Sequence, residues 1–127
     1  WGMDNRTTAV RIPAGPPQAK RLEHRVAGAD ANPYLALAAV LAGILHGIND
    51  ELEPPSAVEG NAWDKEHDVP DLPVLMSSAI EQFEQSEFVA KYLSTEFQTL
   101  FSKTKWQELN EFQRRVTEFE VETYLRG

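Results

Sequence analysis

The sequence Arg21-Leu22-Glu23-His24-Arg25 places two arginines around one glutamate, and Arg6 and Arg11 stand just upstream. Successive side chains of a β-strand point to opposite faces, so Arg21, Glu23 and Arg25 would share one face. At about 3.3 Å of rise per residue, the two arginines would lie about 13 Å apart with the carboxylate between them. Such a row can hold an anion, a metal and an anion in line, as a phosphorylated substrate requires. The alternative is two exposed salt bridges that contribute little to stability.

The composition is that of a soluble globular domain, with 127 residues, 42% hydrophobic and 25% charged. A net charge of −8 argues against general nucleic-acid binding and against anionic membranes as partners. The charge is uneven, because residues 1–30 carry a net charge of +2 and the remainder −10. We therefore expect a local anion-binding patch on an acidic protein.

The chain has no cysteine, which excludes disulfides, thiolate metal sites and cysteine catalysis within it. This is compatible with the cytoplasm, where we expect the protein to be located. The first residues show no signal-peptide pattern. The chain opens on Trp1, and with a motif starting at Asn5 it is expected to be a piece of a longer protein.

The first half of the sequence predicts two strands and one helix. Thr7–Ile12 is β-branched and apolar, and residues 21–26 can pair with it in antiparallel fashion. Asn32-Pro33 is a strong helix start, with Asn32 as N-cap. The run Tyr34–Ile48 is apolar nearly all round but too short for an ordinary transmembrane span, which predicts a buried helix. One short chain covers such a helix poorly, so we expect missing partners.

The second half predicts a loop and then helices. Asp50–Pro73 contains four prolines and many acids, which indicates a surface excursion. A helical period returns at Leu75, and Ser86 can cap a short helix. Thr104 and Gln107 are spaced as a capping box for a last long helix. Its recurring apolar face is expected in a core or interface and comprises Trp106, Leu109, Phe112, Val116 and Phe119. The predicted fold is α+β, a two-stranded remnant of a larger catalytic sheet followed by a mainly helical part.

Three motifs then give a specific resemblance: Asn5–Pro13 (NRTTAVRIP), Arg21–Arg25 (RLEHR) and Ala31–Leu35 (ANPYL). In this order they resemble the C-terminal catalytic region of the glutamine synthetase family. The amino-acid sequence of these motifs is most similar to that of the γ-glutamylpolyamine synthetase branch. The resemblance implies that residues 1–127 are the C-terminal part of a glutamine-synthetase-like catalytic domain. The N-terminal β-grasp domain and the first part of the catalytic domain would be absent.

The resemblance implies an ATP-dependent ligase that phosphorylates the side-chain carboxylate of glutamate, after which an amine displaces phosphate from γ-glutamyl phosphate. Both steps develop negative charge on transferring oxygens, so arginines and divalent metals are the suitable groups. It also implies Mg²⁺ or Mn²⁺ with ATP and a homo-oligomeric ring. The amine is expected to be a polyamine, and the isolated chain is expected to be inactive.

The family pattern also implies roles for five residues. Arg6 would contact the transferring phosphate and glutamate, and would be catalytic. Arg11 and Arg21 would bind the ATP phosphates. Glu23 would be a metal ligand, since carboxylate oxygen suits Mg²⁺ or Mn²⁺. Arg25 would hold a glutamate carboxylate, where planar bidentate geometry matters.

Two departures from the family pattern qualify this prediction. Gln18 stands where many bacterial members carry a basic residue, so no basic nucleotide contact is expected there. Trp63 stands where the family's Asn-x-Tyr-Asp carries a tyrosine that can be adenylylated, and it has no hydroxyl for that modification. The three histidines are not expected to be ligands: His24 is expected to be packed or to lie in an interface, His46 to be satisfied in the core and His67 to face solvent.

Two alternatives stay open at this point. The first is glutamine synthetase proper, which uses ammonia, because the residues that choose the amine would lie upstream. The second is a non-catalytic assembly module whose helices serve oligomer contacts.

Overall fold

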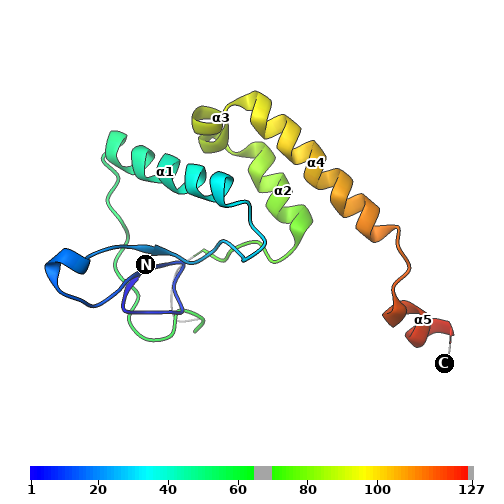
Figure 1. Ribbon diagram of the computed structural model, residues 1–127, viewed down its shortest axis with the longest axis horizontal. Coiled ribbons are helices and arrows are strands. Elements are labelled where there is room, and N and C mark those ends of the chain that lie inside the picture. Colours follow the sequence, from blue (N-terminus) through cyan, green and yellow to red (C-terminus); the bar gives the residue numbers. More distant parts are fainter. Residues whose placement is uncertain (65–69, 126–127) are drawn as a thin grey trace. The chain divides into compact units, whose positions relative to one another are not determined.

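The computed structural model describes residues 1–64 and 70–125 (Figure 1). The chain divides into two compact units, Trp1–Pro70 and Asp71–Gly127. In its described residues the first unit contains three short strands, a short 3₁₀ helix and one α-helix, and the second unit contains α-helices. The α+β class predicted from the sequence is therefore confirmed. Within the described ranges, no helix combines the length and apolar character needed to cross a membrane.

The sheet of the first unit has the order β1 (Gly2–Met3), β2 (Val10–Ile12) and β3 (Glu23–His24). β2 and β3 run antiparallel with Arg11 opposite Glu23, as the sequence predicted for its two strands. β1 pairs in parallel with β2, with Gly2 opposite Arg11. This third strand was not predicted, because two residues carry no periodic signal.

The predicted strand Thr7–Ile12 begins only at Val10. The Thr8 hydroxyl donates to the carbonyls of Asn5 at 3.0 Å and Val10 at 2.9 Å. The backbone N–H of Thr7 donates to the Asn5 side-chain oxygen at 3.0 Å. These side-chain to backbone bonds fold residues 5–8 into a turn and compete with the strand ladder. β3 is likewise shorter than predicted, because its partner strand offers only three residues.

Helix α1 (Pro33–Asn49) begins where the sequence predicts. The side-chain oxygen of Asn32 accepts from the N–H groups of Tyr34 at 3.0 Å and Leu35 at 3.2 Å. The prediction of a buried helix is wrong for this chain, because only Ala42 of the helix is buried. Large apolar side chains such as Ile48 are exposed, because the described residues supply no cover for a helix without a polar face.

The predicted surface excursion has little regular structure over its described part, but it returns to the start of the chain. Val58 is buried, and its N–H donates to the carbonyl of Trp1 at 2.9 Å. The indole N–H of Trp1 donates to the carbonyl of Pro55 at 2.7 Å. We call residues 55–62 the strap. It brings a distant segment of chain against the loop that carries Arg6.

The second unit contains α2 (Met76–Gln85), α3 (Glu87–Leu93), α4 (Thr95–Gln113) and α5 (Glu118–Leu125). α2 and α3 both pack against α4. Phe83 of α2 contacts Phe101 of α4, with ring centroids 5.2 Å apart, and Phe101 stacks on Phe97 at 5.4 Å. The predicted Ser86 cap of α3 is confirmed, since its side chain accepts from the N–H of Val89.

The capping box predicted at Thr104 and Gln107 is wrong. α4 starts earlier, where the Ser94 side chain accepts from the N–H of Phe97 at 3.2 Å. Thr104 lies inside the helix, and its hydroxyl donates to the carbonyl of Leu100 at 3.0 Å. A threonine hydroxyl can bond the carbonyl four residues earlier, so the sequence spacing alone did not distinguish a cap from a helix interior.

The long apolar face predicted for the last helix is interrupted, because α4 ends at Gln113 and α5 starts at Glu118. The capping box lies here instead. The side-chain oxygen of Glu120 accepts from the N–H of Thr117 at 2.8 Å, and the N–H of Glu120 donates to the Thr117 hydroxyl at 3.3 Å. Three members of the predicted face are exposed: Phe112, Val116 and Phe119.

Candidate functional site

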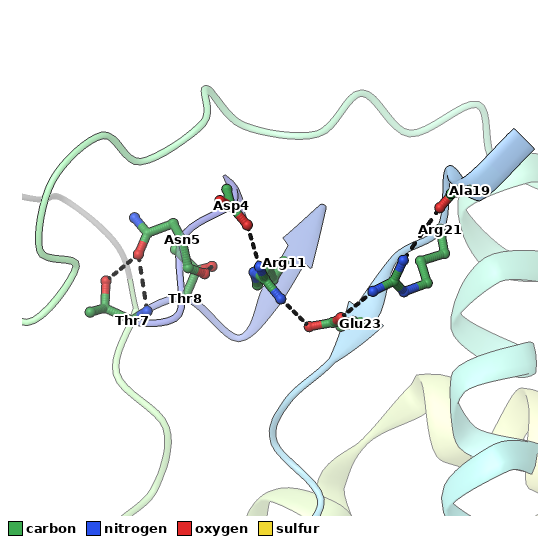
Figure 2. A network of polar contacts seen from close by, with 8 residues as sticks. All are labelled: Asp4, Asn5, Thr7, Thr8, Arg11, Ala19, Arg21 and Glu23. Atoms are coloured by element: carbon green, nitrogen blue, oxygen red, sulfur yellow. Dashed lines mark hydrogen bonds and ion pairs between the residues drawn. The ribbon is translucent and has the colours of Figure 1, made fainter. Parts of the chain in front are cut away.

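The charged residues of the first unit form a row across the sheet (Figure 2). Nη1 of Arg11 donates to Glu23 at 2.9 Å, and its Nη2 pairs with the carboxylate of Asp4. The other oxygen of Glu23 accepts from Nη2 of Arg21 at 3.2 Å. The row predicted along one strand therefore runs across β2 and β3, in the order Asp4, Arg11, Glu23 and Arg21.

The pairing of the strands explains this arrangement. The β2–β3 register sets Arg11 directly opposite Glu23, so the two side chains meet on one face of the sheet. Asp4 follows β1 in the left-handed region at φ 48°, which aspartate tolerates better than most residues. Its N–H donates to the carbonyl of Ile12 at 2.8 Å, which brings its carboxylate beside Arg11.

The row fixes the protonation of its members. The hydrogen bond from Arg11 holds the pKa of Asp4 below its usual value, and the same guanidinium lowers the pKa of Glu23 with a further contribution from Arg21. Hydrogen bonds to Glu23 and then Asp4 raise the pKa of Arg11. Both acids are therefore ionised at neutral pH, and Glu23 presents a carboxylate.

Arg11 is the most enclosed member of the row, with 13% of its side chain exposed. Its Nε is buried and has no hydrogen-bond partner in the described part of the chain. Arg21 is more accessible, with 57% of its side chain exposed. Of the two arginines predicted to bind ATP phosphates, Arg21 is thus the more accessible to a ligand, and it also pairs with Glu23.

The other two predicted arginines lie outside this row. Arg6 follows β1, is exposed, and lines an open cavity of about 610 Å³ together with Glu59 and Gly60 of the strap. Arg25 follows β3 and its N–H donates to the carbonyl of Ala9 at 2.8 Å. Neither guanidinium forms an ion pair within residues 1–64 and 70–125. Both are cations open to an anion, and their predicted roles stay predictions.

The surroundings of Glu23 bear on its predicted role as a metal ligand. Both of its oxygens accept from arginines, and no group of three His, Cys, Asp or Glu side chains in the described ranges could hold a metal ion. The described residues therefore form no complete metal site around Glu23. Glu23 can supply one hard oxygen ligand to a site whose other ligands come from elsewhere.

The sequence reading missed the polar residues that flank Arg6. The side-chain amide of Asn5 donates to the carbonyls of Gly60 at 2.8 Å and Val58 at 3.2 Å. Its oxygen accepts from the N–H and the hydroxyl of Thr7, as Figure 2 shows. Asn5 belongs to a recognised motif, but no local signal identifies partners more than fifty residues away.

The remaining polar residues take no part in the ion pairs of the row. Gln18 lies in a short 3₁₀ helix. His24 is exposed, so it is not packed within this chain, and its position in an interface stays a prediction. His46 is half-buried and its Nδ1 lies 2.9 Å from the carboxylate of Asp50. His67 lies outside the described residues. Trp63 is 80% exposed, on a turn next to the strap.

The comparisons with known proteins agree with this reading. The family model "Glutamine synthetase, catalytic domain" matches residues 1–124. The chain is 44% identical to "Gamma-glutamylputrescine synthetase PuuA" of Escherichia coli, and the match covers 100% of this chain and 26% of that protein. It is 39% identical to "Type-1 glutamine synthetase 2" of Dictyostelium discoideum, covering 98% of the chain and 24% of that protein.

A solved structure shows the same fold. The structure "Apo GmaS without ligand" aligns with a TM-score of 0.75 and 32% identity, covering 98% of this chain and 29% of that one. The chain thus spans about a quarter of the length of the relatives it matches. Since the family model covers nearly all of it, the chain belongs to the glutamine synthetase family and forms part of its catalytic domain.

Proposed function

We propose that a protein carrying this chain is an ATP-dependent ligase that joins glutamate to an amine through γ-glutamyl phosphate. The observation that carries the proposal is the row in which Arg11 keeps Glu23 ionised, with exposed cations at Arg6 and Arg25. Both chemical steps place negative charge on oxygens, which fixed guanidinium groups stabilise. A cluster of paired and unpaired arginines around one carboxylate suits this chemistry.

Each residue has a part in the proposal. Arg6 would stabilise the transferring phosphoryl group, and Arg25 would hold a carboxylate of glutamate in planar bidentate fashion. Arg21 would contact the ATP phosphates from its accessible position, and Arg11 would do so from within the row. Glu23 would lend one oxygen to the Mg²⁺ or Mn²⁺ that shields the phosphates when bound. Arg11 and Arg21 keep that carboxylate aligned and charged.

We further propose that the amine is a polyamine. The support is the 44% identity to a γ-glutamylputrescine synthetase. The second candidate is ammonia, which the 39% identity to a glutamine synthetase favours. A homo-oligomeric ring and a cytoplasmic location are also part of the proposal, and they rest on the resemblance alone.

The first experiment measures phosphate release by the full-length protein with ATP, Mg²⁺ and glutamate, comparing ammonia with putrescine. Glutamate-dependent release that is faster with putrescine supports the ligase and the polyamine. Faster release with ammonia makes the protein a glutamine synthetase. If neither amine gives phosphate release, the ligase proposal is contradicted and a non-catalytic assembly module is favoured instead.

A variant pair makes the test specific to the site. Glu23→Ala is expected to lose metal-dependent turnover while the protein still assembles, as measured by size-exclusion chromatography with light scattering. The matched control is Glu122→Ala, which removes an exposed glutamate of α5. Equal activity of the two variants would contradict the role of Glu23.

A further inference from the structure

Both chain neighbours of Arg6 are tied to the strap. On one side, the Asn5 side-chain amide donates to the carbonyls of Val58 and Gly60 at 3.2 and 2.8 Å. On the other side, the Thr7 hydroxyl accepts from the N–H of Ala62 at 2.9 Å. The strap therefore holds the backbone before and after Arg6, across more than fifty residues of sequence.

These bonds form one closed polar circuit. The N–H of Ala62 donates to the Thr7 hydroxyl, which donates to the Asn5 oxygen at 2.7 Å. The Asn5 amide nitrogen then donates back to the strap carbonyls. The donors and acceptors thus follow one another in a single direction along the circuit. Hydrogen bonds joined in such a chain polarise and strengthen one another.

Close packing leaves the circuit little freedom. Gly2 passes so near that a Cβ placed on it would lie 2.7 Å from Cβ of Asn5 and 3.0 Å from the carbonyl oxygen of Val58. A larger residue would displace Asn5 or the strap. Gly2 of β1 therefore packs closely against both Asn5 and the strap.

The strap also shapes the space that Arg6 faces. Glu59 and Gly60 line the same open cavity of about 610 Å³ as Arg6. A displacement of the strap would therefore move the two neighbours of Arg6 and another part of the cavity lining together. At a reacting centre, a shift of about 1 Å can lower the rate about 10²-fold.

We propose that Asn5 and Thr7 are positioning residues, which hold Arg6 in its working position by binding the strap. This inference rests on the proposed function, in which Arg6 meets the transferring phosphoryl group. A simpler role for both residues is to stabilise the loop with no effect on how Arg6 acts. The two roles differ in one measurable respect, because a positioning residue has no further effect once Arg6 is removed.

The test is a double-mutant cycle in the full-length protein, with Asn5→Ala placed in the Arg6 and Arg6→Ala backgrounds. kcat/KM for glutamate is expected to fall about 10²-fold in the first background and by less than about twofold in the second. Thr7→Val is expected to behave like Asn5→Ala, and Thr7→Ser to restore activity because it keeps the hydroxyl. Asn110→Ala removes an exposed asparagine of α4 and serves as the control.

A second readout on the same proteins is the affinity for inorganic phosphate, measured by calorimetry. Equal losses in both Arg6 backgrounds would overturn the positioning role. If no protein turns over glutamate but the cycle is still non-additive in phosphate affinity, the ligase proposal fails and the positioning role stands. If Arg6→Ala changes neither turnover nor phosphate affinity, Arg6 holds no anion and the positioning role is overturned. Should Asn5→Ala not fold, the Thr7→Val and Thr7→Ser pair decides between these outcomes.

Discussion

At the scale of single residues, the partners of Arg11 determine what the charged motif can do. Read along the strand, Glu23 stands between Arg21 and Arg25, but in the structure its second partner is Arg11 from the neighbouring strand. Arg25 is left open. One cross-strand pair therefore separates the arginines into those that hold the carboxylate and those that can meet an anion.

The row makes a prediction about titration. Because the pKa values of Asp4 and Glu23 are lowered, the ion pairs stabilise the folded chain above the usual carboxyl pKa of about 4. That stability is lost as the pH falls through the lowered values. In Arg11→Gln both pKa values are expected to rise toward their usual range. Carboxyl carbon resonances followed against pH measure this.

The control for that titration is Arg114→Gln, which neutralises an arginine at the end of α4. It should leave the titrations of Asp4 and Glu23 as they are in the unaltered chain. Unchanged pKa values in Arg11→Gln would show that Arg11 does not hold the two carboxylates in solution.

At the scale of elements, α2 and α4 are joined by one buried amide. Gln98 is 6% exposed, and its Nε2 donates to the carbonyls of Phe83 at 2.7 Å and Ser86 at 2.9 Å. These carbonyls lie at the end of α2, and each also accepts a backbone N–H, Phe83 from Ser86 at 3.3 Å and Ser86 from Ala90 at 3.1 Å. A side chain of α4 therefore hydrogen-bonds to the backbone at the C-terminal end of α2.

Gln98→Ala is expected to lower the free energy of unfolding by about 1–3 kcal/mol, because it removes two hydrogen bonds made by a buried amide. Gln107→Ala, on the exposed side of the same helix, should change it by less than about 0.5 kcal/mol. Urea unfolding followed by circular dichroism measures both. Equal effects would show that the buried amide contributes no more than an exposed one.

The capping box of α5 predicts a dependence on pH. The N–H and then the hydroxyl of Thr117 donate to Glu120, which lowers the pKa of that carboxyl. The cap therefore supports the first turn of α5 above the usual glutamate pKa of about 4.3 and is lost as the pH falls through the lowered value. Amide exchange and Cα shifts of residues 118–121, recorded from neutral to acid pH, are expected to show this loss.

Glu120→Gln keeps an oxygen acceptor but cannot titrate, so the pH dependence of these shifts should disappear. Glu122→Gln should preserve it, because Glu122 takes no part in the cap. A first turn of α5 that responds to pH equally in both variants would contradict the capping role of Glu120.

At the scale of the whole molecule, the chain contains part of a site. Among the described residues no group of three ligating side chains could hold a metal ion, and α1 leaves most of its apolar residues exposed. We therefore expect the 127-residue chain alone to show no glutamate-dependent ATP turnover. Phosphate release by the purified chain, beside the full-length protein under the same conditions, measures this. Turnover by the chain alone would contradict the expectation.

The sequence by itself determined the features that depend on neighbouring residues. The Asn32 and Ser86 caps, the antiparallel pair and the family membership all follow from short motifs, because cap and turn chemistry act within a few residues. The same locality explains one failure: Thr104 and Gln107 match a capping box by spacing, yet they lie inside a helix.

Only the tertiary structure decided which charges meet and what holds Arg6. The partner of Glu23 depends on the strand register, and the partners of Asn5 lie on the strap, far along the sequence. The exposure of α1 likewise depends on what else is present to cover it. Such contacts arise from the path of the whole chain, because hydrogen bonds and burial join residues by distance in space and not by separation in sequence.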